Sequence, residues 1–135
     1  MSERVEGVIC FGDSIFAGTG ASDRQLGSAK LVKSALAVSV SLKSRNRDTS
    51  QMALQRVEND VLSQKSYSHV VVLFGNNDSW IDENGKPYIG LEQFEVNINR
   101  ILDLINENGQ IPMVCNLQPI DPIKFANTFP VEFQV

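Results

Sequence analysis

The amino-acid sequence predicts an α/β fold in which a parallel sheet lies between layers of helices. Short apolar segments alternate with longer amphipathic segments, which is the order that right-handed crossovers build into a parallel sheet. The run at 70–74 is apolar at every position, as is typical of a strand covered on both faces. At 135 residues the chain has the length of one domain with one core, and we expect a single domain over 1–135.

Composition and charge argue against several kinds of partner. Hydrophobic residues make up 42% of the chain and charged residues 21%, and no apolar run approaches the ~20 residues of a membrane span. The polar start, Met1-Ser2-Glu3-Arg4, leaves no room for a signal peptide, so we expect a cytoplasmic protein without membrane contact. With a net charge of −4, we interpret Lys43, Arg45 and Arg47 as a solvated edge rather than a nucleic-acid site.

The first part of the chain predicts a strand, a helix and a second strand. The apolar segment 5–11 is the first strand, and it ends at Gly12-Asp13-Ser14, which either presents a hydroxyl or makes a plain turn. Apolar residues at three- and four-residue spacings over 26–36 then predict an amphipathic helix. Alternation of valine and leucine with serine and lysine over 38–43 predicts a half-buried strand.

A second helix follows a polar loop, with Asp48 or Thr49 as its expected N-cap residue. Helical spacing divides its side chains into a set that faces the core and a set that faces water. The set expected to face the core is Met52, Leu54, Val57 and Val61. The set expected to face water is Gln55, Arg56, Glu58 and Asn59.

The second part of the chain predicts a third strand, a long helix and a fourth strand. In the loop 79–88 after the third strand, Trp80 and Tyr88 either line a binding site or pack the loop down. The helix is expected over 91–108, with Gly109 as the residue that ends it, and the fourth strand over 111–117. The apolar tail 123–135 has no clean period.

Polar residues follow three of the predicted strands at the point where each strand ends. Ser14 follows the first strand, Asn46 the second, and Gly75-Asn76-Asn77-Asp78 the third. Because the carboxyl ends of parallel strands meet at one edge of a sheet, we expect these side chains to lie close together. Independent turns have no reason to bring a serine, asparagines and aspartates to the same edge. The pattern therefore predicts a functional site there.

These segments resemble those of the SGNH (GDSL) hydrolase family. The segment Phe11-Gly12-Asp13-Ser14-Ile15-Phe16-Ala17-Gly18 is similar to the family's first block, and 75–78 is similar to its third block, Gly-x-Asn-Asp. The resemblance covers about residues 5–120. It implies a three-layer, flavodoxin-like α/β/α sandwich. It also implies hydrolysis of a small acyl or acetyl ester, without a metal or an organic cofactor.

The resemblance also implies roles for individual residues. Ser14 would be the nucleophile that forms an acyl-enzyme, and its backbone N–H would donate to the oxyanion. The side-chain amide of Asn77 would be a second oxyanion donor, a contribution typically worth about 3 to 4 kcal/mol of barrier. Asp13 and Asp78 would shape the turns and support their neighbours, as would Gly75 and Asn46.

Two features depart from the family pattern. The family's second block supplies a glycine N–H to the oxyanion hole, but the stretch 46–57 has no glycine, although Asp48-Thr49-Ser50 and Leu54-x-Arg56 are similar to that block. The family also takes its general base from an Asp-x-x-His block near the C-terminus, which this sequence lacks. The one histidine, His69, enters the third strand and is therefore expected roughly a strand length, ~17 Å, from Ser14.

Three explanations for the missing base stay open at this point. The sequence is a shortened form of a longer enzyme, or a second subunit supplies the base, or the protein is a non-catalytic binding or interaction module.

An uncovered sheet edge would favour self-association, so we expect a homo-oligomer such as a dimer. The tail residues that could cover this edge are Phe125, Phe129, Val131, Phe133 and Val135. The two cysteines, Cys10 and Cys115, lie in apolar segments without metal-binding spacing and are expected to be buried thiols.

Overall fold

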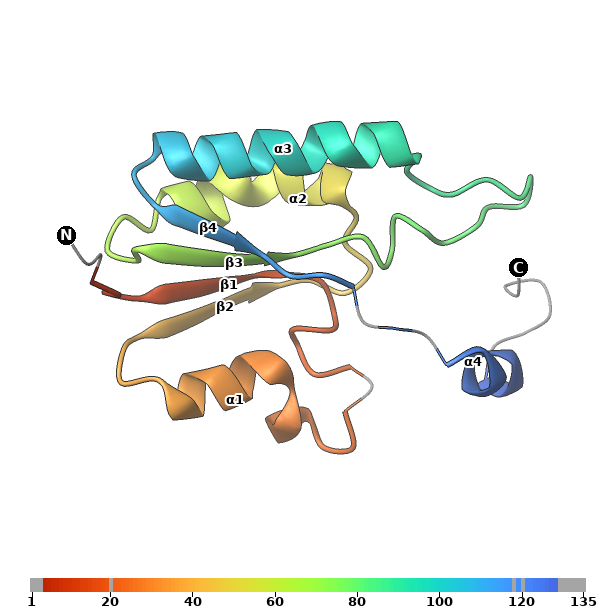
Figure 1. Cartoon of the computed structure of the whole chain (residues 1–135), viewed down its shortest axis with the longest axis horizontal. Helices are drawn as coiled ribbons and strands as arrows, with labels where there is room; N and C mark the ends of the chain where they lie inside the picture. Colours follow the sequence, from red (N-terminus) through yellow and green to blue (C-terminus); the bar gives the residue numbers. More distant parts are fainter. Residues whose placement is uncertain (1–3, 20, 118, 120, 129–135) are drawn as a thin grey trace.

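The computed structural model describes residues 4–19, 21–117, 119 and 121–128, and it contains a four-stranded parallel sheet (Figure 1). The strands lie in the order β2-β1-β3-β4. They are β1 (Val8–Gly12), β2 (Val40–Ser44), β3 (His69–Leu73) and β4 (Ile111–Val114). This order matches the first four strands of a flavodoxin-like sheet, and the predicted α/β fold class is confirmed.

Helices cover both faces of the sheet, as the alternating pattern predicts. Helix α1 (Ser28–Ala35), preceded by the short turn η1 (Arg24–Leu26), lies on one face. On the other face lie α2 (Ser50–Val57), its π-helical continuation η2 (Glu58–Leu62), and α3 (Leu91–Glu107) (Figure 1). The short helix α4 (Pro122–Thr128) follows β4 and lies apart from these layers. Within the described residues, no helix is long and apolar enough to span a membrane.

The register of the central strands brings three loops to one edge of the sheet. Gly12 at the end of β1 pairs with Ser44 of β2 and with Leu73 of β3. The segments that follow these strands therefore leave the sheet side by side. Strand β4 pairs with β3 and is an edge strand of four residues, shorter than the predicted segment 111–117.

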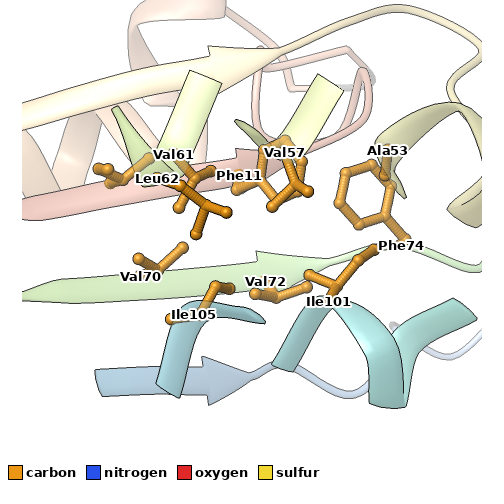
Figure 2. Packing of buried hydrophobic residues seen from close by; sticks show 11 residues of the cluster. Phe11, Ala53, Val57, Val61, Leu62, Val70, Val72, Phe74, Ile101 and Ile105 are labelled. Carbon is orange, nitrogen blue, oxygen red and sulfur yellow. The ribbon is translucent and has the colours of Figure 1, made fainter. Parts of the chain in front are cut away.

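The larger hydrophobic core lies between the sheet and the helices α2, η2 and α3 (Figure 2). Strand residues Phe11 and Phe74 meet there edge to face, with ring centroids 5.0 Å apart. The fully enclosed members of this core come from strands and helices alike: Ile9, Phe11, Ala53, Val57, Val61, Val70, Val72, Ile101 and Ile105. The absence of polar alternation in β3 follows from this core on one face and a smaller apolar cluster on the other.

The helix on the opposite face is less buried than its amphipathic pattern predicts. Leu31 is 48% exposed and Leu36 is 41% exposed, whereas Ala29 is buried. Met113 of β4, on the face of the sheet that α1 covers, is 45% exposed. The tail residues expected to cover apolar surface, Phe129, Val131, Phe133 and Val135, lie outside the described residues, as does the side chain of Phe125.

The predicted faces of the second helix are partly wrong. Met52, expected in the core, is 49% exposed, and Arg56, expected in water, is only 6% exposed. The Arg56 side chain lies in the interior because it forms ion pairs there with Asp48 and Asp60. Thr49 is the N-cap residue, and its hydroxyl accepts a hydrogen bond from the Met52 N–H at 3.3 Å.

The loop after β3 and the long helix agree closely with the prediction. Gly85 adopts φ +74°, the left-handed conformation typical of an Asn-Gly turn, and Ile81 bridges to Pro87 across the loop. Helix α3 ends at Glu107, and Gly109 follows with φ +80°, the left-handed conformation expected of the glycine that ends a helix. Cys10 is a buried free thiol and Cys115 a partly buried one.

Candidate active site

Ser14 lies in the tight turn that leaves β1 at the sheet edge. Its side chain is partly exposed, while the preceding Asp13 is fully buried. A glycine is required at position 12, because a Cβ atom there would lie 2.6 Å from the Phe16 ring and 2.9 Å from the Leu73 carbonyl oxygen. The close approach of β1 to β3 at this point therefore fixes where Ser14 emerges.

The carboxylate of Asp13 connects the first and third polar segments. Its Oδ1 accepts the Ile15 N–H at 2.9 Å, which shapes the turn around Ser14. Its Oδ2 accepts hydrogen bonds from the side-chain amides of Asn76 at 3.3 Å and Asn77 at 3.4 Å. Residues more than 60 positions apart in sequence are thus brought together next to Ser14.

Asn77 has its amide nitrogen oriented by two acceptors. Besides Asp13, the Asn77 Nδ2 donates to the backbone carbonyl of Asp48 at 2.8 Å. Both acceptors require the NH₂ end of the amide rather than its oxygen at this position. The contact to Asp13 is long, so the second amide hydrogen is weakly held beside the Ser14 turn.

Asp78 holds the third segment to the helices rather than pointing toward Ser14. Its carboxylate accepts the backbone N–H of Ser50 at 2.9 Å and also the Ser50 hydroxyl. Asn97 of α3 donates to that hydroxyl at 3.0 Å, and its own Oδ1 accepts a hydrogen bond from Gln93 at 2.9 Å. Asn97 was not among the predicted site residues, although it lies at core spacing, three residues after Phe94 and four before Ile101.

Arg56 joins the first strand to the loop after β2. Its Nε lies 2.6 Å from Asp48, and its NH1 lies 2.7 Å from Asp60. Its NH2 donates to the carbonyl of Gly12 at 2.9 Å, and its guanidinium lies 4.5 Å from the centre of the Phe11 ring. Arg56 thus compensates the buried carboxylate charge of Asp48. The backbone carbonyl of the same residue accepts the hydrogen bond from Asn77.

The loop after β2 adopts a glycine-like backbone without containing a glycine. Arg47 has φ +62°, a conformation that favours glycine. The neighbouring Arg45 N–H donates to the Gly12 carbonyl at 3.2 Å, which holds the loop beside the Ser14 turn. Asn46 is exposed in this loop, and the described hydrogen bonds that connect Asp13, Asn77 and Asp48 do not include it.

His69 lies at the opposite end of the sheet from Ser14, as predicted from its place at the start of β3. It pairs with Val8 at the beginning of β1, and its Nδ1 lies 2.7 Å from the Ser68 hydroxyl. Across the part of the chain that the structure describes, no imidazole or carboxylate is hydrogen-bonded to the Ser14 hydroxyl. No cluster of three or more potential metal ligands is found among these residues either.

The sequence matches the GDSL-like Lipase/Acylhydrolase family over residues 10–133. The chain belongs to this family. The segments that the match spans include Ser14, Asn77 and the loop after β2. This GDSL-family protein is therefore related to esterases and acylhydrolases. No curated protein matches the chain.

Solved structures of esterases share the fold of this GDSL-family chain. The lipase/acylhydrolase from Enterococcus faecalis is 28% identical, with a TM-score of 0.62, and the match covers 84% of this chain and 59% of that one. The acetyl xylan esterase AlAXEase is 23% identical, with a TM-score of 0.73 and coverage of 94% and 66%. The psychrotrophic esterase EstA from Pseudoalteromonas sp. is 19% identical, with a TM-score of 0.68 and coverage of 95% and 69%.

The present chain is shorter than these related structures. Its matches to three further solved structures of related proteins span 58%, 47% and 61% of the length of those chains. The shared fold therefore covers roughly half to two thirds of the length of these related structures.

Burial dominates the electrostatics of the Asp13 carboxyl. Loss of water raises the pKa of Asp13 above its usual range, and the nearby carboxylates of Asp48 and Asp78 raise it further. Hydrogen bonds from the Ile15 N–H and the Asn76 amide act in the opposite direction but do not cancel the rise. The negative charge of Asp13 therefore costs stability in the folded GDSL-family protein.

The free energy of unfolding is expected to carry a pH signature of Asp13. Because the pKa is higher in the folded than in the unfolded protein, the stability that Asp13 contributes is complete below the unfolded value, about 4, and is lost as the pH rises through the folded value. The unfolding free energy of the native protein minus that of Asp13→Asn should therefore increase as the pH is lowered toward the unfolded pKa. Urea denaturation across this pH range measures it, and a difference that shrinks on acidification contradicts the assignment.

Proposed function

We propose that this protein is a serine ester hydrolase in which Ser14 is the nucleophile and Asn77 an oxyanion donor. The observation that supports the proposal is the contact of Asp13 Oδ2 with the Asn77 amide, because Asp13 directly precedes Ser14. A hydroxyl nucleophile and an oriented amide donor thus lie at one sheet edge. The family membership of the chain supports an ester as the substrate class.

The mechanism follows from these two groups. Ser14 Oγ attacks the acyl carbonyl carbon, and the carbonyl oxygen gains negative charge. The Ser14 N–H and the Asn77 amide donate hydrogen bonds to this oxygen. Collapse of this intermediate expels the alcohol and leaves an acyl-serine, which water then hydrolyses to the free acid. The second amide hydrogen of Asn77 is suited to this step, because its resting contact with Asp13 is long, 3.4 Å.

The proton of Ser14 has to pass to a base, and we propose that this base comes from outside the described residues. His69 is held at the other end of the sheet by its place in β3, so it does not meet the ~3 Å requirement of proton transfer. A further segment of a longer polypeptide or a neighbouring subunit would supply the imidazole. Without it, the hydroxyl keeps its ordinary pKa and reacts slowly.

Hydrolysis of p-nitrophenyl acetate and butyrate tests the proposed function. In the protein together with the segment or subunit that supplies the base, we expect release of p-nitrophenol that falls at least 10³-fold in Ser14→Ala, because the covalent route is lost. Ser66→Ala is the matched control, since Ser66 is an exposed serine in the turn before β3, at the opposite end of the sheet, and it should keep its rate. Activity that survives Ser14→Ala would remove this serine from the mechanism.

A second candidate function is a non-catalytic binding or interaction module. The observation that favours it is that the Ser14 hydroxyl has no hydrogen-bonded base within the described residues. This function predicts no turnover of either ester, together with retained binding of an uncleavable acyl or sugar ligand at the same edge. Ser14-dependent turnover excludes it.

A further inference from the structure

Positive charge is concentrated where β2 ends. The residues that carry it are Lys43, Arg45 and Arg47, which we call the basic segment. The two arginines are exposed and the lysine is partly exposed, in agreement with the solvated edge expected from the sequence. The net charge of the chain is −4, so the basic segment has the opposite sign to the protein as a whole. Such a local reversal of charge favours an anionic ligand.

The fold anchors the basic segment to both parts of the candidate site. The Arg45 N–H donates to the carbonyl of Gly12, at the end of β1, at 3.2 Å. The Asp48 carbonyl accepts the amide of Asn77, the proposed oxyanion donor, at 2.8 Å. Arg47 lies between these two anchored residues, and its Cα is about 3.8 Å from the Cα of Asp48. Its positive charge is therefore carried on a loop that is fixed beside the bound ester.

The basic segment has no carboxylate partner among the residues that the structure describes. Within this part of the chain, the arginines that form ion pairs are Arg56 and Arg100. The carboxylate nearest in sequence, Asp48, is bound by Arg56 at 2.6 Å. The carboxylate of Asp13 accepts backbone and amide N–H groups instead. The guanidinium groups of the basic segment are thus available to a ligand, and guanidinium binds carboxylate and phosphate in a bidentate geometry.

The backbone of Arg47 is a second indication that its side chain has a role. Its φ of +62° lies in the left-handed region, which costs stability for any residue other than glycine. The side chain is exposed and forms no ion pair with a described residue that would offset this cost. A glycine would make the same turn with less strain. A strained and charged residue beside a candidate site is therefore better explained by what it binds than by the fold.

We propose that the basic segment selects esters that carry an anionic group, a carboxylate or a phosphate. The proposal rests on the proposed function, because it places the ester carbonyl at Ser14 and Asn77 and the anionic group at Arg45 and Arg47. Two opposite unit charges 4 Å apart in water attract each other by about 1 kcal/mol, which changes affinity about fivefold. The two arginines together should therefore favour an anion over a neutral ligand of the same shape by about 25-fold at low salt.

Binding of uncleavable amides tests the proposal without requiring catalysis. N-acetyl-β-alanine and 2-acetamidoethyl phosphate carry the anion on the side of the leaving group, and N-propylacetamide is their neutral counterpart. Succinamate carries the anion on the acyl side, and butanamide is its neutral counterpart. The two sets also distinguish a carboxylate from a phosphate.

NMR titrations at low salt should show at least one anion that binds about tenfold or more tightly than its neutral counterpart. Sodium chloride at about 1 M should reduce this preference to less than about threefold, because it screens exposed charges. Equal affinity within both sets, or no binding of any anion, overturns the proposal. A preference that salt does not reduce also overturns it.

Substitutions separate the charge of Arg47 from its backbone conformation. Arg47→Gln keeps the strained backbone and should lower the preference for the anion about threefold or more. Arg47→Gly should show the same loss without a fall in melting temperature, because glycine adopts positive φ readily. Arg100→Gln removes the same charge from an exposed arginine of α3 and should retain the native preference. Equal losses in Arg47→Gln and Arg100→Gln overturn the proposal, as does a native preference in Arg47→Gly.

Anion binding and ester hydrolysis can fail independently. If the anionic amides bind as expected while p-nitrophenyl acetate and butyrate stay intact, the basic segment binds anions in a protein that lacks the proposed hydrolytic function. If hydrolysis depends on Ser14 while the amides of each set bind equally, the proposed function holds and the selection of anionic esters is wrong.

Discussion

Replacing Arg56 with methionine is expected to lower the free energy of unfolding by roughly 3 to 5 kcal/mol. Methionine has a similar length but removes the contact of the guanidinium with the Phe11 ring, the ion pairs with Asp48 and Asp60, and the hydrogen bond to the Gly12 carbonyl. Asp48 is 5% exposed, so its carboxylate would be left charged and uncompensated in the interior. Chemical denaturation at neutral pH measures the loss.

The control for this substitution is Arg100→Met on α3. Arg100 is largely exposed, and its contact with Glu107 is 4.0 Å long, so removing the charge should change stability by less than about 0.5 kcal/mol. A second variant, Asp48→Asn combined with Arg56→Met, removes both charges and should recover part of the loss. Equal stability of Arg56→Met and Arg100→Met would contradict the structural role assigned to Arg56.

Replacing Asn77 with alanine is expected to lower kcat for p-nitrophenyl butyrate by about 10²- to 10³-fold. The loss comes from the amide hydrogen that stabilises charge in the transition state, so KM should change much less than kcat. Steady-state kinetics at saturating ester measures both constants. The hydrogen bond to the Asp48 carbonyl is lost as well, so circular dichroism should accompany the kinetics to show that the fold persists.

Asn76→Ala is the discriminating comparison for this prediction. Both asparagines donate to Asp13 Oδ2, at 3.3 and 3.4 Å, but the Asp48 carbonyl contact and the proposed oxyanion contact are assigned to Asn77. A role confined to Asn77 predicts a loss of less than about tenfold for Asn76→Ala. Similar losses in the two variants would mean that the amides serve only to hold the turn.

The sequence predicted the fold well where its pattern was local. Strand β3 and helix α3 were recognisable because their apolar residues follow simple periods and because Gly109 ends the helix with φ +80°. The convergence of three strand ends followed from the parallel order of the strands alone. Burial of α1 was overestimated, because periodicity gives the direction of an apolar face but not what covers it.

The supporting groups of the site were harder to predict, because they depend on contacts between distant segments. An arginine between polar neighbours is expected at the surface. Arg56 is buried because Asp48, Asp60 and the Gly12 carbonyl, which lie close to it only in the folded chain, bind its guanidinium. Likewise, Asp78 and Ser50 are 28 positions apart, and no local signal links them. The left-handed backbone at Arg47 was not predictable either, since arginine does not favour it.

Mass spectrometry after phosphonate labelling tests most directly whether Ser14 is the nucleophile. An ethyl phosphonate with a p-nitrophenol leaving group would be attacked by Ser14 Oγ at phosphorus, which releases p-nitrophenol and leaves an ethylphosphonyl-serine. One adduct is expected, on the peptide that contains Ser14, in the native protein and in Ser66→Ala but not in Ser14→Ala. An adduct on another residue, equal labelling of Ser14→Ala, or no adduct in the native protein would contradict it.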